Sequence, residues 1–213
     1  MSTTLQTYNT DCRRLLHDAT GAFWTDSELT DFINEARNRV VRDTGCLRTL
    51  QTSNVSANVE SYIFSSSLPN GNVTMDIINM NLIWGSSRQP LFYLPWTDFN
   101  TRLRYWQNNR GRPIAYCLYG PTTFYVGPMP DQTYGIEADT VVLPTPMVNL
   151  TDVDTIPDPW TSTVPFYASH LAKYKEQSYG EAEIFLQQYK QKTQNVLSGT
   201  FTRRMFSPYI SIY

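Results

Sequence analysis

Charged residues and histidines are scarce in this sequence, and both shortages exclude classes of function. Asp, Glu, Lys and Arg make up 17% of the 213 residues, whereas about 25% is usual for soluble domains. With a formal net charge of −2, the chain has no overall basic field to hold nucleic acid tightly. The two histidines, His17 and His170, are not spaced as a pair of metal ligands. A dedicated nucleic-acid-binding protein and a zinc protein are therefore disfavoured.

Cysteine pairs and long apolar runs are also missing. The three cysteines, Cys12, Cys46 and Cys117, show no CxxC spacing, and their odd number indicates reduced, buried thiols of a protein assembled in the cytosol. No run of about 18 apolar residues occurs, so we expect no transmembrane helix and no membrane partner. Residues 1–10 are polar and do not resemble a secretory signal.

The common catalytic and cofactor motifs are absent as well. The sequence contains no Walker loop, GxGxxG, HExxH or GxSxG pattern. Asp152, Asp154 and Asp158 lack the glycine and the terminal glutamate of a calcium loop, so we interpret them as part of a solvated connector. His17 is expected to be exposed near a helix end, and His170 to be a core or interface residue. We expect no enzymatic activity, no cofactor and no metal.

Aromatic residues, in contrast, are abundant. The chain has 14 Tyr, 10 Phe and 5 Trp. Tyr and Trp are favoured at interfaces because they combine a large apolar body with a polar tip. The composition leaves two interpretations open: a β-rich domain with an aromatic core, or a surface that other chains cover.

Helical periodicity marks the first part of the chain. Residues 4–18 repeat apolar side chains at three- and four-residue spacing, which predicts an amphipathic helix stopped by Gly21. Thr25 and Glu28 have the spacing of a capping box, with Trp24 and Leu29 at the positions of a hydrophobic staple. A second helix therefore begins after Thr25, and Gly45 ends it near residue 43.

The middle of the chain is typical of short strands separated by turns. A short helix is expected at residues 96–108, with Thr97 as its cap. The frequent turns favour an antiparallel sandwich or a small barrel over a parallel sheet. The predicted strands are residues 62–64, 73–78, 81–84, 90–94, 113–119, 123–126 and 136–142.

Helices return after the connector at residues 149–158. One begins near Ser162 with Pro165 in its first turn, where proline is tolerated, and Gly180 separates it from a further helix at residues 181–197. We predict an α+β fold in which helices from both ends form one bundle around an inserted β region. The predicted parts are residues 1–52, N-terminal helices; 53–149, the β insertion; 150–197, C-terminal helices; and 198–213, an extended C-terminal arm.

Two segments are candidate binding sites. Arginines and aromatics gather at Arg102, Arg104, Tyr105, Trp106, Arg110 and Arg112, a combination that suits single-stranded nucleic acid or, as the negative net charge favours, a protein interface. The arm, residues 198–213, is apolar and has no acid, so it either folds back on its own core or docks on another chain. Its alternation suits strand addition to a sheet edge, and we favour docking because the preceding helix is expected to end at Gly199. The candidate contact residues of the arm are Phe201, Arg203, Arg204, Met205, Phe206, Tyr209, Ile210, Ile212 and Tyr213.

Three stretches together resemble the head–tail adaptor, or connector, family of tailed bacteriophages. The first is Phe23-Trp24-Thr25-Asp26-Ser27-Glu28-Leu29 with Phe32-Ile33-Asn34-Glu35-Ala36. The second is Gly111-Arg112-Pro113, continuing through Tyr116 and Tyr119-Gly120 to Val126-Gly127-Pro128-Met129-Pro130-Asp131. The third is Ile156-Pro157 ahead of the aromatic helix at residues 166–174.

The resemblance implies a non-enzymatic virion protein at the head–tail junction, assembled in the host cytoplasm. It implies a ring, commonly a dodecamer, which docks beneath the portal protein and extends the channel through which double-stranded DNA passes. The C-terminal arm of such proteins often reaches into the portal, and the other side offers a platform to the tail tube or nozzle protein. Two alternatives stay open: another tail-tube or nozzle subunit, and a nucleic-acid-binding module that uses residues 102–112.

Overall fold

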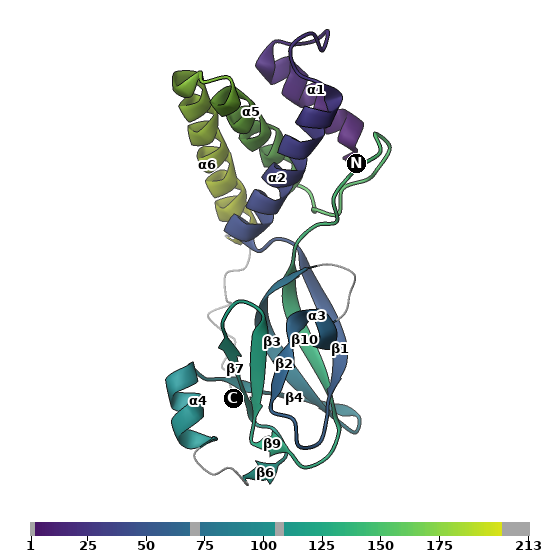
Figure 1. Ribbon diagram of the computed structural model, residues 1–213, viewed down its shortest axis with the longest axis vertical. Helices are drawn as coiled ribbons and strands as arrows, with labels where there is room; N and C mark the ends of the chain where they lie inside the picture. The colour runs from purple at the N-terminus through teal and green to yellow at the C-terminus, as the bar shows by residue number, and fades with distance from the viewer. Residues whose placement is uncertain (1–2, 69–72, 105–108, 202–213) are drawn as a thin grey trace, which may run out of the picture. The chain divides into compact units, whose positions relative to one another are not determined.

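The computed structural model describes residues 3–68, 73–104 and 109–201. It divides into two compact units, one of which is inserted in the sequence between the two parts of the other. The helical unit contains the chain up to Cys46 and again from Pro144 onward, and the β unit is Leu47–Leu143. Figure 1 shows both units, with the helices of the helical unit coloured at the two ends of the scale and the β unit in the middle colours. The fold is α+β, as the sequence predicts.

Four α-helices and one 3-10 helix make up the described part of the helical unit. α5 contacts α1, α2 and α6, and Figure 1 shows it among them. Its small residues Ala168, Ser169 and Ala172 are buried, which lets neighbouring backbones approach closely. The elements are α1 Leu5–Leu16, α2 Asp26–Thr44, η1 Trp160–Thr163, α5 Val164–Lys175 and α6 Tyr179–Phe201.

The start of α2 follows its sequence signal closely. The Glu28 backbone N–H donates to Thr25 Oγ1, and the Glu28 carboxylate accepts from the Thr25 backbone N–H, so the predicted capping box is confirmed. Gly45 ends the helix in the left-handed conformation, with φ 60°, which glycine adopts at little cost. The predicted stop of α1 at Gly21 is wrong, because His17 already adopts that conformation and caps the helix.

The C-terminal helices differ from the prediction at both ends of α6. Pro165 lies in the first turn of α5 as expected. Gly180, however, does not separate the two helices, because it lies in the first turn of α6. Gly199 lies inside the last turns of the same helix. Because α6 continues to Phe201, residues 198–201 of the predicted extended arm are helical.

The β unit contains two four-stranded sheets. The first has the order β1 Arg48–Val55, β10 Tyr134–Val142, β3 Thr74–Trp84 and β4 Ser87–Pro90, all antiparallel. The second has the order β2 Ser61–Ile63, β8 Thr123–Gly127, β7 Ala115–Tyr119 and β5 Phe92–Tyr93. The pair β5–β7 is parallel, as is the small pair of β6 Arg110–Gly111 with β9 Met129–Pro130. Two short helices, α3 Phe64–Ser67 and α4 Trp96–Arg102, complete the unit.

Both sheets contribute to one buried core, which contains part of the aromatic residues of the middle region. Each sheet ends in two edge strands, so the sheets do not close and the predicted barrel alternative is wrong. The rings of Tyr62 and Phe124 stack within this core with centroids 5.3 Å apart. The core residues are Val55, Ile77, Met80, Leu82, Tyr134, Ile136 and Ala138 from the first sheet and Tyr62, Tyr116, Phe124 and Val126 from the second.

Three local features of the β unit differ from the prediction. Strand β1 was not expected from the sequence pattern, and β3 is one continuous strand where two were expected. Helix α4 begins after Pro95 rather than after Thr97. It lies close to β8, because a Cβ on Gly127 would come within 2.8 Å of the Phe99 ring.

Candidate functional site

Arg104 is the best-anchored member of the predicted arginine cluster. Its Nε lies 3.1 and 3.2 Å from the two carboxylate oxygens of Glu60, and its Nη2 lies 2.7 Å from one of them. The guanidinium carbon lies 5.1 Å from the ring centroid of Trp96 and 5.4 Å from that of Tyr125. The hydrogen bonds to Glu60 raise the pKa of Arg104 above its ordinary value. This geometry combines a fork-shaped ion pair with cation–π contacts, which lysine cannot reproduce.

The rings around Arg104 form an aromatic cluster on the face of the second sheet that carries α4. Trp96 lies 4.5 Å from Tyr119 and 5.0 Å from Tyr125, measured between ring centroids. Phe99 of the same helix is fully buried beneath them, and Gly127 makes room for its ring. Tyr119 remains half exposed, so the cluster presents an aromatic surface with a fixed shape.

The remaining members of the arginine cluster are not gathered into one basic patch. Arg112 lies over the Trp84 ring, with 5.3 Å between guanidinium carbon and ring centroid. Arg102 ends α4 and Arg110 lies in β6, and both are exposed. Tyr105 and Trp106 lie outside the described residues. Because Glu60 already pairs with Arg104, the nucleic-acid interpretation of residues 102–112 loses one of its four cations, whereas the ring contact of Arg112 leaves its charge in place.

Large apolar side chains are exposed at one edge of the second sheet. Phe92 and Tyr93, which form the edge strand β5, are 69% and 54% exposed. Ile114 lies next to them, since its carbonyl accepts the Phe92 backbone N–H, and it is 46% exposed. The β unit contains no lysine at all: the four lysines of the chain lie between residues 173 and 192. Arginine and aromatic enrichment with lysine depletion is typical of protein interfaces.

The second candidate site, the C-terminal arm, falls mostly outside the described part of the chain. Phe201 is the last residue of α6, and its side chain is not described. Arg203, Arg204, Met205, Phe206, Tyr209, Ile210, Ile212 and Tyr213 lie in residues 202–213, which the structure does not describe. Their role as a contact segment therefore stays a prediction.

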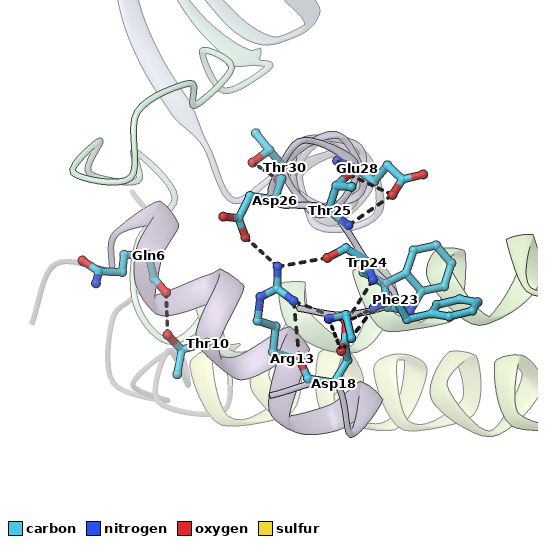
Figure 2. A network of polar contacts seen from close by, with 11 residues as sticks. Gln6, Thr10, Arg13, Asp18, Phe23, Trp24, Thr25, Asp26, Glu28 and Thr30 are labelled. Carbon is cyan, nitrogen blue, oxygen red and sulfur yellow. Dashed lines mark hydrogen bonds and ion pairs between the residues drawn. The ribbon is translucent and has the colours of Figure 1, made fainter. Parts of the chain in front are cut away.

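A polar network that the sequence analysis missed orders the turn between α1 and α2 (Figure 2). The Asp18 carboxylate accepts hydrogen bonds from the backbone N–H groups of Ala22, Phe23 and Trp24. Arg13 reaches the same carboxylate at 3.3 Å and also binds Asp26 at 2.6 Å. The Trp24 N–H bond is the largest cause of a pKa for Asp18 below its ordinary value. The network joins the end of α1 to the start of α2.

A second missed network fastens the connector after the β unit to the helices. The Asp154 side chain is fully buried, and its carboxylate accepts from Arg37 Nη2 at 2.7 Å and from Tyr8 Oη at 2.5 Å. The Arg37 side chain is only 1% exposed and also donates to the Thr145 carbonyl. Burial, with the Asp154 charge, raises the pKa of Tyr8 far above its ordinary value. The predicted solvated connector is therefore wrong at Asp154, which is a buried partner of Arg37.

Further ionisable groups have structural surroundings. Burial raises the pKa of the Cys12 thiol to about 12, and all three cysteines are free thiols, with Cys12 and Cys117 buried. His17 is exposed at the end of α1, and His170 Nδ1 lies 2.8 Å from the Ala182 carbonyl. Burial and hydrogen bonding within the fold thus account for the surroundings of Cys12 and His170.

The described residues contain neither a cluster of metal ligands nor a helix suited to crossing a membrane. Within them, no three His, Cys, Asp or Glu side chains are placed to hold a metal ion together. None of the helices in the part of the chain that the structure describes combines the length and the apolar character that a membrane crossing requires. What the described surfaces offer is a rigid aromatic and arginine-bearing face, suited to contact with other macromolecules.

The sequence was compared with known proteins. No curated protein matches it. A protein family described as SU10 adaptor protein, a family of phage head-to-tail adaptors, matches residues 3–208. The match covers elements of both units, from α1 to beyond the end of α6. The chain therefore belongs to the SU10 adaptor family and is a structural head-to-tail adaptor of a bacteriophage, a component of the virion and not a member of an enzyme class.

Proposed function

We propose that this chain assembles into a ring beneath the phage portal, extends the DNA channel, and offers the attachment platform for the tail tube or nozzle. The observation that carries the proposal is the family match over residues 3–208, because it spans both units rather than one module. Twelve copies are the number that the family resemblance favours. Assembly takes place in the host cytoplasm, and the ring occupies the head–tail junction.

The β unit is proposed as a contact surface between neighbouring subunits or with the tail. Arg104 and the aromatic cluster of Trp96, Tyr119 and Tyr125 present a fixed shape, and Phe92 and Tyr93 expose apolar area at the sheet edge. Rigid aromatics lose little entropy when a partner covers them. Arg102, Arg104, Tyr105, Trp106, Arg110 and Arg112 are the candidate contact residues on this side.

The C-terminal arm is proposed as the portal contact. Beyond the end of α6 the sequence has two arginines, several apolar residues and no acid, so water is a poor environment for much of it. The candidate portal residues are Phe201, Arg203, Arg204, Met205, Phe206, Tyr209, Ile210, Ile212 and Tyr213.

The proposed channel does not require a strongly basic wall. A chain with a net charge of −2 binds duplex DNA weakly, which permits passage. The pairing of Arg104 with Glu60 also removes a cation that would otherwise retain the phosphate backbone. Neutralising Arg102 and Arg110 is therefore expected to leave DNA affinity unchanged in a salt-titrated binding assay.

The test is assembly with the purified portal of the same phage. The full chain is expected to co-sediment with the portal as one defined multimer by native mass measurement. A chain ending at Phe201 keeps the whole of α6 and is expected to lose portal binding while retaining its circular dichroism spectrum. A chain in which residues 202–213 are replaced by a Gly/Ser segment of equal length controls for length.

The outcomes separate the parts of the proposal. Unchanged portal binding by the shortened chain would remove the arm from the portal contact. A full chain that stays monomeric in the presence of the portal would overturn the ring, and binding to the tail tube instead would favour the tail-subunit alternative.

A further inference from the structure

A groove of about 510 Å³ runs along the helical unit between the N-terminal half of α2 and the loop that follows Pro144. One wall carries Asp26, Thr30 and Asp31, and the other carries Met147, Val148 and Leu150. Two of these positions, Asp26 and Thr30, are visible in Figure 2 beside the Arg13 network. The two walls differ in chemistry, since one is acidic and the other apolar.

Hydrogen bonds hold the two walls of the groove together. Asn34 of α2 donates to the Met147 carbonyl at 2.9 Å, and its side-chain oxygen accepts the Met147 N–H at 2.9 Å. The loop is also held from within, because Asp152 accepts from the Val148 N–H at 2.8 Å. Gln6 of α1 donates its backbone N–H to the Leu150 carbonyl at 3.0 Å. The groove is thus formed in advance of any ligand, which lowers the entropy cost of binding.

The groove selects for a ligand that is both cationic and apolar. No basic side chain lines it, and Asp31 is exposed without an ion-pair partner among the described residues. Asp26 binds Arg13 yet its side chain remains 69% exposed. On the opposite wall Val148 is 76% exposed and Leu150 47%. A peptide with adjacent arginines and a large apolar residue satisfies both walls.

This chain contains such a peptide in its own arm. Arg203-Arg204-Met205-Phe206 combines two adjacent cations with two large apolar side chains, and residues 198–213 contain no acid that would oppose binding. Pro208 follows and separates this segment from the uncharged residues 209–213. The arm therefore has two chemically distinct parts.

The helix geometry decides which copy supplies the segment. Tyr189 of α6 binds Asp43 near the end of α2 at 2.8 Å, and α6 runs in the same direction as α2, because α5 is antiparallel to both. Phe201 lies twelve residues past Tyr189 on α6, so it lies about 18 Å beyond the level of Asp43 at the helical rise. The groove begins near Thr30 on α2, about 20 Å from Asp43 in the opposite direction. Five extended residues beyond Phe201 span only about 17 Å. The segment cannot reach the groove of its own subunit.

We propose that the groove between α2 and the 146–150 loop binds Arg203-Arg204-Met205-Phe206 of a second copy of this chain. The inference deepens the proposed function and rests on it in taking neighbouring copies as partners. Arg203 and Arg204 face Asp26 and Asp31, and Met205 and Phe206 cover Val148 and Leu150. Under this inference residues 203–206 contact the neighbouring copy instead of the portal, and of the candidate portal residues of the arm those in 209–213 make the portal contact.

Cysteine trapping between full-length chains tests the proposal. A Val148→Cys chain and a Met205→Cys chain, mixed and mildly oxidised in the presence of the portal, are expected to give a cross-linked dimer. An Ile184→Cys chain, whose substituted residue on α6 is also half exposed, replaces Val148→Cys as the matched control and is expected to give about tenfold less product. Asp31→Arg in the Val148→Cys chain is expected to lower the yield about tenfold, and Arg203→Glu with Arg204→Glu in the other chain to restore it.

Several results would overturn the inference: equal yields from Val148→Cys and Ile184→Cys, insensitivity to Asp31→Arg, or a product confined to one chain in a Val148→Cys/Met205→Cys double variant. Portal co-sedimentation of the same chains separates this from the proposed function. Portal binding without the cross-link removes the groove contact and leaves the adaptor, whereas a cross-link without portal binding removes the proposed docking and leaves the groove contact.

Discussion

Two ion pairs, one in the helical unit and one in the β unit, lie in different environments. In the helical unit, Arg37 and Asp154 are 1% and 0% exposed, and their pair fixes the connector that enters from the β unit. In the β unit, Arg88 pairs with Glu137 across the first sheet while 62% exposed, above an apolar core that closes without it. A buried pair costs much when one partner is removed, whereas an exposed pair contributes little. The Arg37–Asp154 pair is therefore expected to contribute more to stability than the Arg88–Glu137 pair.

Removing Arg37 is expected to cause the largest loss in the free energy of unfolding. Arg37→Met leaves the Asp154 carboxylate buried without its cation, which is expected to cost about 3–5 kcal/mol in the free energy of unfolding. Urea unfolding followed by circular dichroism measures the loss.

The double variant Arg37→Met/Asp154→Asn serves as the control for Arg37→Met. It removes both charges and is expected to recover a large part of the loss. A cost below about 1 kcal/mol for Arg37→Met alone would show that the pair does not hold the connector.

Gly127→Ala probes packing in the β unit. The added Cβ would meet the Phe99 ring at 2.8 Å and Leu103 at 3.0 Å, and Phe99 is fully buried, so α4 must shift. The expected destabilisation is about 1–3 kcal/mol, read from thermal unfolding. Gly111→Ala, where no atom lies within 4 Å of the new Cβ, is the matched control and should be close to neutral. Equal effects at the two glycines would contradict the close approach of α4.

Acid titration of the helical unit tests the Glu28 contacts. The hydrogen bond from Lys175, followed by those from Thr25, lowers the pKa of Glu28 from 4.5 to about 2. The folded state thus binds this proton more weakly than the unfolded state, so the stabilisation is fully present above about pH 4.5 and is lost as the pH falls towards 2. The difference in unfolding free energy between wild type and Glu28→Gln should shrink over that range. A difference independent of pH would show that the charge of Glu28 makes no contribution.

Arg88→Ala is expected to change the free energy of unfolding least. Arg88 is 62% exposed, whereas Glu137 is 11% exposed and keeps a hydrogen bond from Asn81, so the loss should be about 1 kcal/mol, well below that of Arg37→Met. Its unfolding midpoint in urea should also become less sensitive to salt than that of the wild type. A loss as large as that of Arg37→Met would erase the contrast between the units.

The parts of the fold with local signals were predictable. The capping box of Thr25 and Glu28 and the left-handed Gly45 define α2 from neighbouring residues alone. Strand β1 was not predicted because its apolar and polar residues do not lie where the usual burial pattern places them: Leu50 is 66% exposed while Gln51 is buried. The side-chain amide nitrogen of Gln51 donates there to Thr74 and Thr140, partners that come from other strands. No local reading of the sequence could supply them.

The buried polar sites were predictable only in part. Arg37 lies on the apolar stripe of α2, four residues from Ile33 and from Val41, and a cation at such a position signals a buried acid. The identity of that acid, 117 residues away, depends on the return of the chain after the whole β unit. Helix α6 extends beyond its predicted end because Gly199 does not stop it. Glycine inside a helix costs only about 1 kcal/mol.

Electron cryomicroscopy of the full chain bound to its portal tests the proposed assembly most directly. The density is expected to show a closed ring in which residues 203–206 lie in the α2 groove of a neighbouring copy and residues 209–213 contact the portal. A structure in which the arm packs wholly against its own subunit, with no extensive contact to any other molecule, would contradict the proposal.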